Sequence, residues 1–147
     1  MGEIRLTPAQ QAVVDDRGGA LLVSAAAGSG KTKVLVDRLL AQVCDPEHPA
    51  NLDDFLMITY TKAAAAELRG KIAAELSKRL AAEPENRHLQ RQTTRIYLAQ
   101  ISTVHAFCAS ILRDYAHLLD IPADFRVAEE QEAAELRQEV FDALMEQ

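Results

Sequence analysis

The sequence predicts an α/β fold in which helices flank a parallel sheet. Apolar runs of strand length occur at residues 20–24 and 55–59, and each leads into a segment whose apolar residues recur at helical spacing. A strand, a helix and a second strand at this spacing form a right-handed crossover unit, from which parallel sheets are built. The near-continuous apolar run at 55–59 predicts a strand that is buried on both faces.

The composition is that of an ordinary globular domain. The chain has 147 residues, of which 48% are hydrophobic and 26% charged. No apolar run approaches the ~20 residues of a membrane span, and the amino terminus lacks the apolar region of a signal peptide. We therefore expect a cytoplasmic protein with no membrane partner. Cys44 and Cys108 fall in expected helices, and we expect them to pack as small hydrophobes rather than to pair.

Charge is distributed unevenly along the chain. The net charge of −6 by itself argues against nucleic-acid binding, but residues 62–95 carry eight Lys or Arg against four Glu. Residues 114–147 carry ten acidic side chains against two Arg. This distribution is compatible with a nucleic-acid strand that touches only the basic part. Two solvated helix faces of opposite charge explain it equally well.

The first expected helix begins at Thr7-Pro8. Thr7 can cap it and Pro8 suits its first position, while Val13 and Val14 give it a buried side. Gln10 lies in its first turn. A glutamine amide can exchange two hydrogen bonds with the edge of adenine, although an exposed helix glutamine is the simpler alternative.

The apolar run at 20–24 leads into a glycine-containing loop and then a helix. The loop reads Ser24-Ala25-Ala26-Ala27-Gly28-Ser29-Gly30-Lys31-Thr32. This order is typical of the phosphate-binding loop of nucleoside triphosphatases, in which glycines let backbone N–H groups turn toward phosphate oxygens. Lys31 can reach the β- and γ-phosphates, and the Thr32 hydroxyl can hold a Mg²⁺ ion. The alternative is a glycine turn that only joins a strand to a helix.

The loop departs from the usual pattern at one position. The first glycine of G-x-x-x-x-G-K-[ST] falls on Ala25, which must therefore keep a negative φ. The expected helix after Lys31 has apolar residues at helical spacing and stops at a surface loop over residues 45–51, which contains two prolines.

The strand at 55–59 runs into a further helix, with Thr61 as a plausible cap. Its apolar stripe falls on Leu68, Ile72, Leu76 and Leu80. Ligands of open α/β sheets bind beyond the carboxyl ends of strands, where Thr59 to Lys62 should lie. Four alanines follow Lys62 and leave room for another backbone, although an alanine-rich helix with a threonine cap is an equally good interpretation.

The rest of the chain predicts three more helices and a short strand. Asn86 can cap a helix ending near Ala99, and residues 100–102 form the possible third strand. A helix then starts at Thr103, where the hydroxyl of Thr103 and the imidazole of His105 suit a phosphate. A capped helix with a satisfied histidine is the alternative. Residues 128–147 predict an acidic amphipathic helix without an obvious partner.

Four segments in this order resemble the Q motif, motif I, motif Ia and motif Ib of the UvrD/Rep superfamily 1 DNA helicases. They are residues 6–10, 25–32, 58–68 and 102–108. Family members often have alanine where Ala25 stands. Residues 23–32 and 124–128 are most similar to the AddA-type subunit of ATP-dependent helicase–nucleases. The resemblance extends over nearly the whole chain.

The resemblance implies a role for each motif. Gln10 would read adenine; Ala25, Ala26, Ala27, Gly28, Ser29, Gly30, Lys31 and Thr32 would bind ATP and Mg²⁺, with Lys31 and Thr32 in catalysis. Thr59, Thr61, Lys62, Ala63, Thr103 and His105 would face single-stranded DNA. Residues 1–119 would be a P-loop, RecA-like ATP-binding domain, part of helicase domain 1A, and residues 120–147 would begin an inserted helical 1B-like subdomain. Such enzymes move 3′ to 5′ along DNA, and this type acts at double-strand breaks, in repair and recombination, with an AddB-type partner subunit.

The catalytic acid of such a motor is missing, because no Asp-Glu pair follows an apolar strand after Thr32. We therefore expect a fragment of a longer enzyme that binds ATP at best and does not unwind DNA alone. A stand-alone nucleotide-dependent binding module is the main alternative. A small phosphoryl-transfer kinase is a third, but the sequence offers neither an acceptor site nor an arginine-rich lid.

Overall fold

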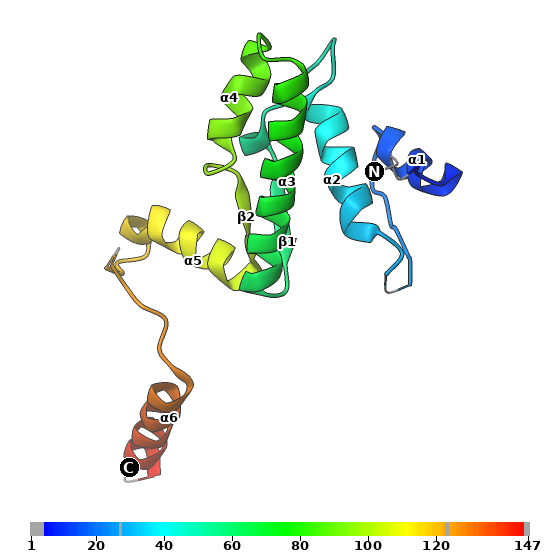
Figure 1. Cartoon of the computed structure of the whole chain (residues 1–147). Helices are drawn as coiled ribbons and strands as arrows, with labels where there is room; N and C mark the ends of the chain where they lie inside the picture. The colour runs from blue at the N-terminus through cyan, green and yellow to red at the C-terminus, as the bar shows by residue number, and fades with distance from the viewer. Residues whose placement is uncertain (1–4, 27, 123, 146–147) are drawn as a thin grey trace. The chain divides into compact units, whose positions relative to one another are not determined.

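The computed structural model describes residues 5–26, 28–122 and 124–145 (Figure 1). It divides into two compact units, residues 1–107 and 108–147. The division falls inside helix α5 (Val104–Asp114). The domain boundary expected after residue 119 stays a prediction.

The first unit combines helices with a small parallel sheet. Its elements in chain order are α1 (Pro8–Asp15), α2 (Lys31–Val43), the 3₁₀ turn η1 (Leu52–Asp54), β1 (Leu56–Thr59), α3 (Lys62–Ala82), α4 (Arg87–Arg95), β2 (Gln100–Thr103) and the start of α5. Strands β1 and β2 pair in parallel, with Leu56 opposite Gln100 and Thr59 opposite Thr103. The predicted α/β class is confirmed, as are the strands at 55–59 and 100–102.

Side-chain caps start the helices where the sequence predicts. Thr7 and Gln10 form a reciprocal capping box at α1, and the Thr61 hydroxyl accepts a hydrogen bond from the N–H of Ala64 at 3.1 Å. The Asn86 side chain accepts two backbone N–H groups at the start of α4. Helix α4 ends at Arg95 rather than near Ala99, because residues 96–99 form turns that lead the chain into β2.

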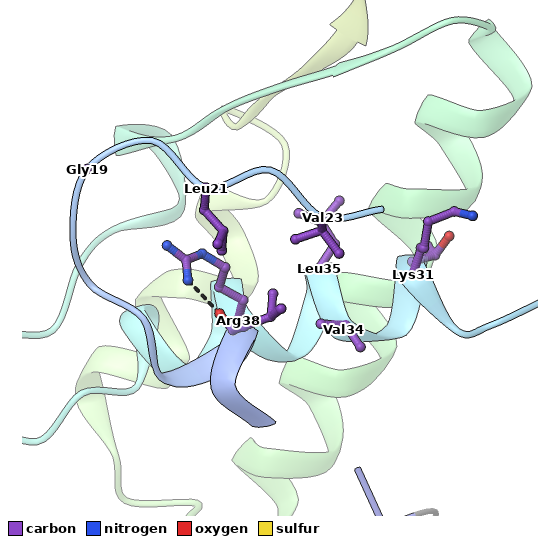
Figure 2. A pocket seen from close by; sticks show the side chains of 9 residues that line it. Gly19, Leu21, Val23, Lys31, Val34, Leu35 and Arg38 are labelled. Atoms are coloured by element: carbon purple, nitrogen blue, oxygen red, sulfur yellow. Dashed lines mark hydrogen bonds between the residues drawn. The ribbon is translucent and has the colours of Figure 1, made fainter. Parts of the chain in front are cut away.

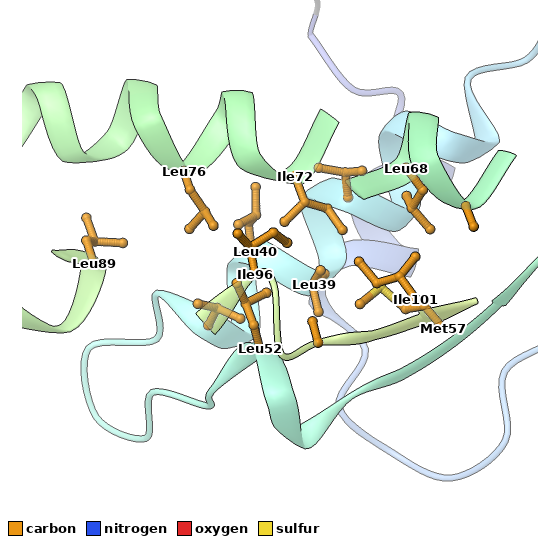
Figure 3. Packing of buried hydrophobic residues seen from close by; sticks show 14 residues of the cluster. Leu39, Leu40, Leu52, Met57, Leu68, Ile72, Leu76, Leu89, Ile96 and Ile101 are labelled. Atoms are coloured by element: carbon orange, nitrogen blue, oxygen red, sulfur yellow. The ribbon is translucent and has the colours of Figure 1, made fainter. Parts of the chain in front are cut away.

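Helix α3 organises the hydrophobic core. Leu68, Ile72 and Leu76 are buried on its inner face, as predicted, and Leu80 is half-buried against the same core. They face residues from α2 and from both strands, among them Leu39, Leu40, Met57 and Ile101 (Figure 3). The four-residue repeat in α3 therefore reflects packing across three neighbouring elements.

Two predictions about strands are wrong. Residues 20–24 form no strand, and Leu22 in their middle is 93% exposed. A strand requires a hydrogen-bonded neighbour, and the sheet of the described residues consists of β1 and β2 alone. Strand β1 is also not buried on both faces, because Met57 points into the core while Leu56 and Ile58 are 49% and 42% exposed.

Long-range hydrogen bonds from basic side chains hold the carboxyl ends of the helices. Arg38 of α2 donates to the carbonyl of Val13, in the last turns of α1. At the end of α2, Arg79 donates to the carbonyl of Leu40 at 3.1 Å, and His88 Nε2 lies 2.9 Å from the carbonyl of Val43. Cationic groups near helix carboxyl ends satisfy free carbonyls and interact favourably with the helix dipole.

The second unit contains the end of α5, the 3₁₀ turn η2 (Ala116–Leu118) and α6 (Glu130–Met145). The Arg126 guanidinium makes two hydrogen bonds to Glu132 and lowers the pKa of that carboxyl group. Helix α6 confirms the acidic helix expected over 128–147, of which residues 146 and 147 lie outside the described residues. No residue of α6 is buried.

The remaining expectations concern cysteines and membranes. Cys44 and Cys108 are both unpaired, but only Cys44 packs against the core, because Cys108 lies on the exposed part of α5. Within the described ranges, no helix combines the length and apolarity needed to cross a membrane.

Gly70 provides a stability prediction, because it lies in the middle of α3 and a Cβ there would meet nothing within 4 Å. We expect Gly70→Ala to raise the free energy of unfolding by about 0.5–1 kcal/mol, measured by urea denaturation, since alanine loses less backbone entropy in a helix. Ala66→Gly on the same exposed side should lower it by a similar amount. A Gly70→Ala variant that is less stable than the parent would contradict this account of α3.

Candidate functional site

The loop between residue 24 and α2 has the backbone geometry expected from its glycines. Gly28 and Gly30 have φ values of 76° and 82°, in the left-handed region that favours glycine. Gly30 is the N-cap of α2, and its carbonyl accepts the N–H of Val34 at 3.0 Å. Ala25 keeps a negative φ, as predicted, since Asp120 is the single non-glycine with positive φ in the described chain. Ala27 lies outside the described residues.

Lys31 is the first residue of α2, and its side chain folds back onto the loop. Its Nζ donates to the carbonyl oxygens of Ala25 and Ala26, the latter at 2.9 Å. Thr32 follows it in the first turn, and both residues are exposed. A cation and a hydroxyl at the positive end of a helix dipole are suited to binding a polyanion and its counter-ion.

Gln10 connects α1 to this loop, 19 residues away in the sequence. Its Nε2 donates to the carbonyl of Ser29 at 3.1 Å, while its Oε1 accepts the backbone N–H of Thr7 at 2.8 Å. The structure therefore places Gln10 beside the phosphate loop, where the sequence predicts an adenine-reading residue.

Two cavities adjoin the loop. The larger, of about 500 Å³, lies between residues 19–23 and α2, and Lys31 and Thr32 form one end of it (Figure 2). The smaller, of about 280 Å³, is bordered by Gln10, Ser29 and Lys31. Lys31 borders both cavities, so its amino group is accessible from either side of the loop.

The second predicted site is at the carboxyl edge of the sheet, where the structure brings its residues together. Thr59 and Thr103 are register partners at the ends of β1 and β2. Lys62 and Ala63 begin α3 directly after the Thr61 cap, and His105 lies in the first turn of α5. The parallel pairing is what makes these segments neighbours, because both strands end at the same edge.

Hydrogen bonds already engage the threonines at this edge. The Thr59 hydroxyl donates to the carbonyl of Thr61 at 3.0 Å, and the Thr103 hydroxyl accepts the N–H of Ala106 at 3.2 Å. Thr103 is buried, whereas Lys62, Ala63 and His105 are exposed. The threonines thus shape the two helix starts, and the exposed residues form the accessible surface.

Sequence reasoning overlooked Tyr60. This side chain stands between Thr59 and Thr61 and is 101% exposed, so it packs on no part of the described chain. An aromatic side chain in full contact with water at a strand end is suited to stacking on a nucleobase. The signal was present in the sequence, as an aromatic residue between two polar residues directly after an apolar strand.

The electrostatics of both sites favour anions. The first turns of α2, α3 and α5 contain no acidic residue, and they carry Lys31, Lys62 and His105 instead. Helix starts normally gain stability from acidic side chains, so this arrangement is unfavourable for the helices alone and favourable for bound phosphates. Among the described residues no cluster of His, Cys, Asp or Glu could hold a metal ion, so Thr32 and the phosphates would have to hold Mg²⁺.

The family of the chain follows from comparison with known proteins. The model of the UvrD/REP helicase N-terminal domain matches residues 6–147. The chain belongs to the UvrD/REP helicase family, and the resemblance noted from four motifs is confirmed.

Its curated relatives share a more specific name. Three proteins named as the AddA-type subunit of an ATP-dependent helicase/nuclease come from Lachnoclostridium phytofermentans, Desulfitobacterium hafniense and Clostridium novyi, and they are 46%, 48% and 40% identical to it. The alignments cover 100%, 99% and 99% of this chain, respectively. The chain spans only 11%, 11% and 12% of the length of these relatives.

The positive φ of Gly30 gives a test of the loop. A Cβ on Gly30 would lie 3.5 Å from Gln10 Nε2, and the φ of 82° strains any other residue. We expect Gly30→Ala to cost about 1–2 kcal/mol of unfolding free energy and to weaken nucleotide binding. Gly18→Ala is the matched control, because its Cβ would make an ordinary 3.7 Å contact and its φ is not positive. Equal stability of the two variants would argue against the left-handed loop.

Proposed function

We propose that this chain is the amino-terminal, RecA-like ATP-binding part of an ATP-dependent DNA helicase, the AddA-type component of a helicase–nuclease. The observation that carries the proposal is the left-handed Gly30 cap, which puts Lys31 and Thr32 into the first turn of α2. Nothing in the hydrophobic core requires these two residues, since both are exposed. Residues 1–119 form the ATP-binding part of domain 1A in this proposal, and residues 120–147 begin the helical insertion.

ATP binding requires Lys31 to exchange partners. Its Nζ gives up the carbonyls of Ala25 and Ala26 and turns to the β- and γ-phosphates. The Thr32 hydroxyl holds the Mg²⁺ ion, which neutralises charge on the same phosphates. Gln10 reads the base by accepting from adenine N6 and donating to N7. The rest of the loop supplies backbone N–H groups.

The sheet edge is the proposed path of single-stranded DNA. Lys62 and His105 contact phosphates, and Ala63 lets the strand approach the start of α3. Thr59, Thr61 and Thr103 keep the helix starts in place, and Tyr60 stacks on a base. The path lies at the carboxyl ends of the parallel strands, where α/β proteins bind ligands.

The activity of the complete protein is part of the same proposal. The relatives are named as parts of an ATP-dependent helicase/nuclease. On the proposed function, the complete enzyme moves 3′ to 5′ along DNA in the cytoplasm and works with an AddB-type subunit in double-strand break repair and recombination. The catalytic acid would come from outside the 147 residues of this chain. The chain by itself therefore binds ATP without unwinding DNA.

The phosphate-loop proposal is tested by Lys31→Ala. We expect this variant to lose detectable binding of a fluorescent ATP analogue, because the loop loses the cation that faces the β- and γ-phosphates. Lys33→Ala is the matched control. Lys33 is two residues away in α2 and pairs with Asp37 at 2.8 Å, so its removal should leave affinity within about twofold. Unchanged affinity in Lys31→Ala would refute the assignment of the loop.

The DNA path is tested by Thr103→Ala combined with His105→Ala. In the complete protein, this pair should weaken single-stranded DNA binding about tenfold, as expected for losing one phosphate contact and a helix cap. Binding of ATP without DNA serves as the control and should not change, because neither residue contacts the loop. DNA affinity equal to that of the parent would show that the strand takes another path.

A further inference from the structure

The amide of Gln10 makes two internal hydrogen bonds at once. Its Oε1 is held at 2.8 Å by the N–H of Thr7, and its Nε2 is 3.1 Å from the carbonyl of Ser29. One bond belongs to the capping box of α1, and the other reaches the phosphate loop directly before Gly30. A single side chain therefore joins the start of a helix to the middle of the loop.

We propose that Gln10 is a positioning residue for the phosphate loop, acting on the triphosphate whichever base is attached. The bond to Ser29 restrains the loop beside its two left-handed glycines, where the backbone has the most freedom to lose. This inference rests on the proposed function, since it assumes that the loop binds a triphosphate, and it adds a role that base reading does not include.

The bond to Ser29 is compatible with a bound triphosphate. Phosphate oxygens accept hydrogen bonds from loop N–H groups, and the Ser29 carbonyl that Gln10 engages is itself an acceptor. Lys31 differs, because its donors must leave the carbonyls of Ala25 and Ala26 before they can reach phosphate. Gln10 can therefore hold the loop in both the empty and the occupied site.

The same two bonds determine what the amide can read. A glutamine amide offers two N–H donors and two acceptor lone pairs, of which Thr7 and Ser29 use one each. They also fix which end is oxygen and which is nitrogen. One donor and one acceptor remain, which matches the N7 and N6 of adenine, whereas guanine presents acceptors at both positions. The bonds to Thr7 and Ser29 thus bias the site toward adenine.

Inorganic tripolyphosphate separates the two roles, because it has no base. We would measure its affinity and that of ATP for the 147-residue chain by calorimetry with Mg²⁺, in the parent, Gln10→Ala and Gln10→Asn. Asparagine keeps the amide but is too short to reach Ser29. Gln11→Ala is the matched control, because Gln11 is on the same helix and bonds to Asp15 rather than to the loop.

We expect both Gln10 variants to bind tripolyphosphate about fivefold more weakly, as for the loss of one hydrogen bond, and ATP more weakly still. Gln11→Ala should match the parent. A variant that binds tripolyphosphate like the parent but loses affinity for ATP would overturn the inference and leave the proposed function intact. If the folded parent bound neither compound, the proposed function would fail and this inference with it.

Discussion

The packing of α3 against α2 and the two strands is the interaction on which the rest of the structure depends. Ile72 and Leu76 are fully buried there, and a buried side chain of this size contributes about 1.5–3 kcal/mol. Because α3 starts where β1 ends, its burial also determines where the carboxyl edge of the sheet lies. The pairing of β1 with β2 then brings Thr59 beside Thr103, so the second site is a consequence of the core.

Local features of the structure could be predicted from the sequence, whereas long-range ones could not. Caps at Thr7, Thr61 and Asn86 depend on residues within one helical turn, and all three were found as expected. The strand expected at 20–24 depends on a partner that no local pattern specifies. The bond from Gln10 to Ser29 joins residues 19 positions apart, so the sequence indicated the type of residue needed but not its contact with the loop.

Both candidate sites trade helix stability for anion binding. Lys31, Lys62 and His105 occupy first turns in which acidic side chains would be more favourable for the helix. The basic side chains that do stabilise helices lie at the opposite ends, as Arg79 does at the carboxyl end of α2. Positive charge is therefore placed for stability at some helix ends and for recognition at others.

The open outer face of β1 has a consequence for the behaviour of the chain in solution. Leu56 and Ile58 project from it, and Leu22 of the extended segment before the phosphate loop is almost wholly exposed. Unpaired strand edges with apolar side chains are templates for pairing with other chains. Net negative charge opposes such contacts only weakly at physiological ionic strength, where charges are screened beyond about 8 Å. Concentrated solutions of this chain should therefore self-associate through β1, more readily as salt is added.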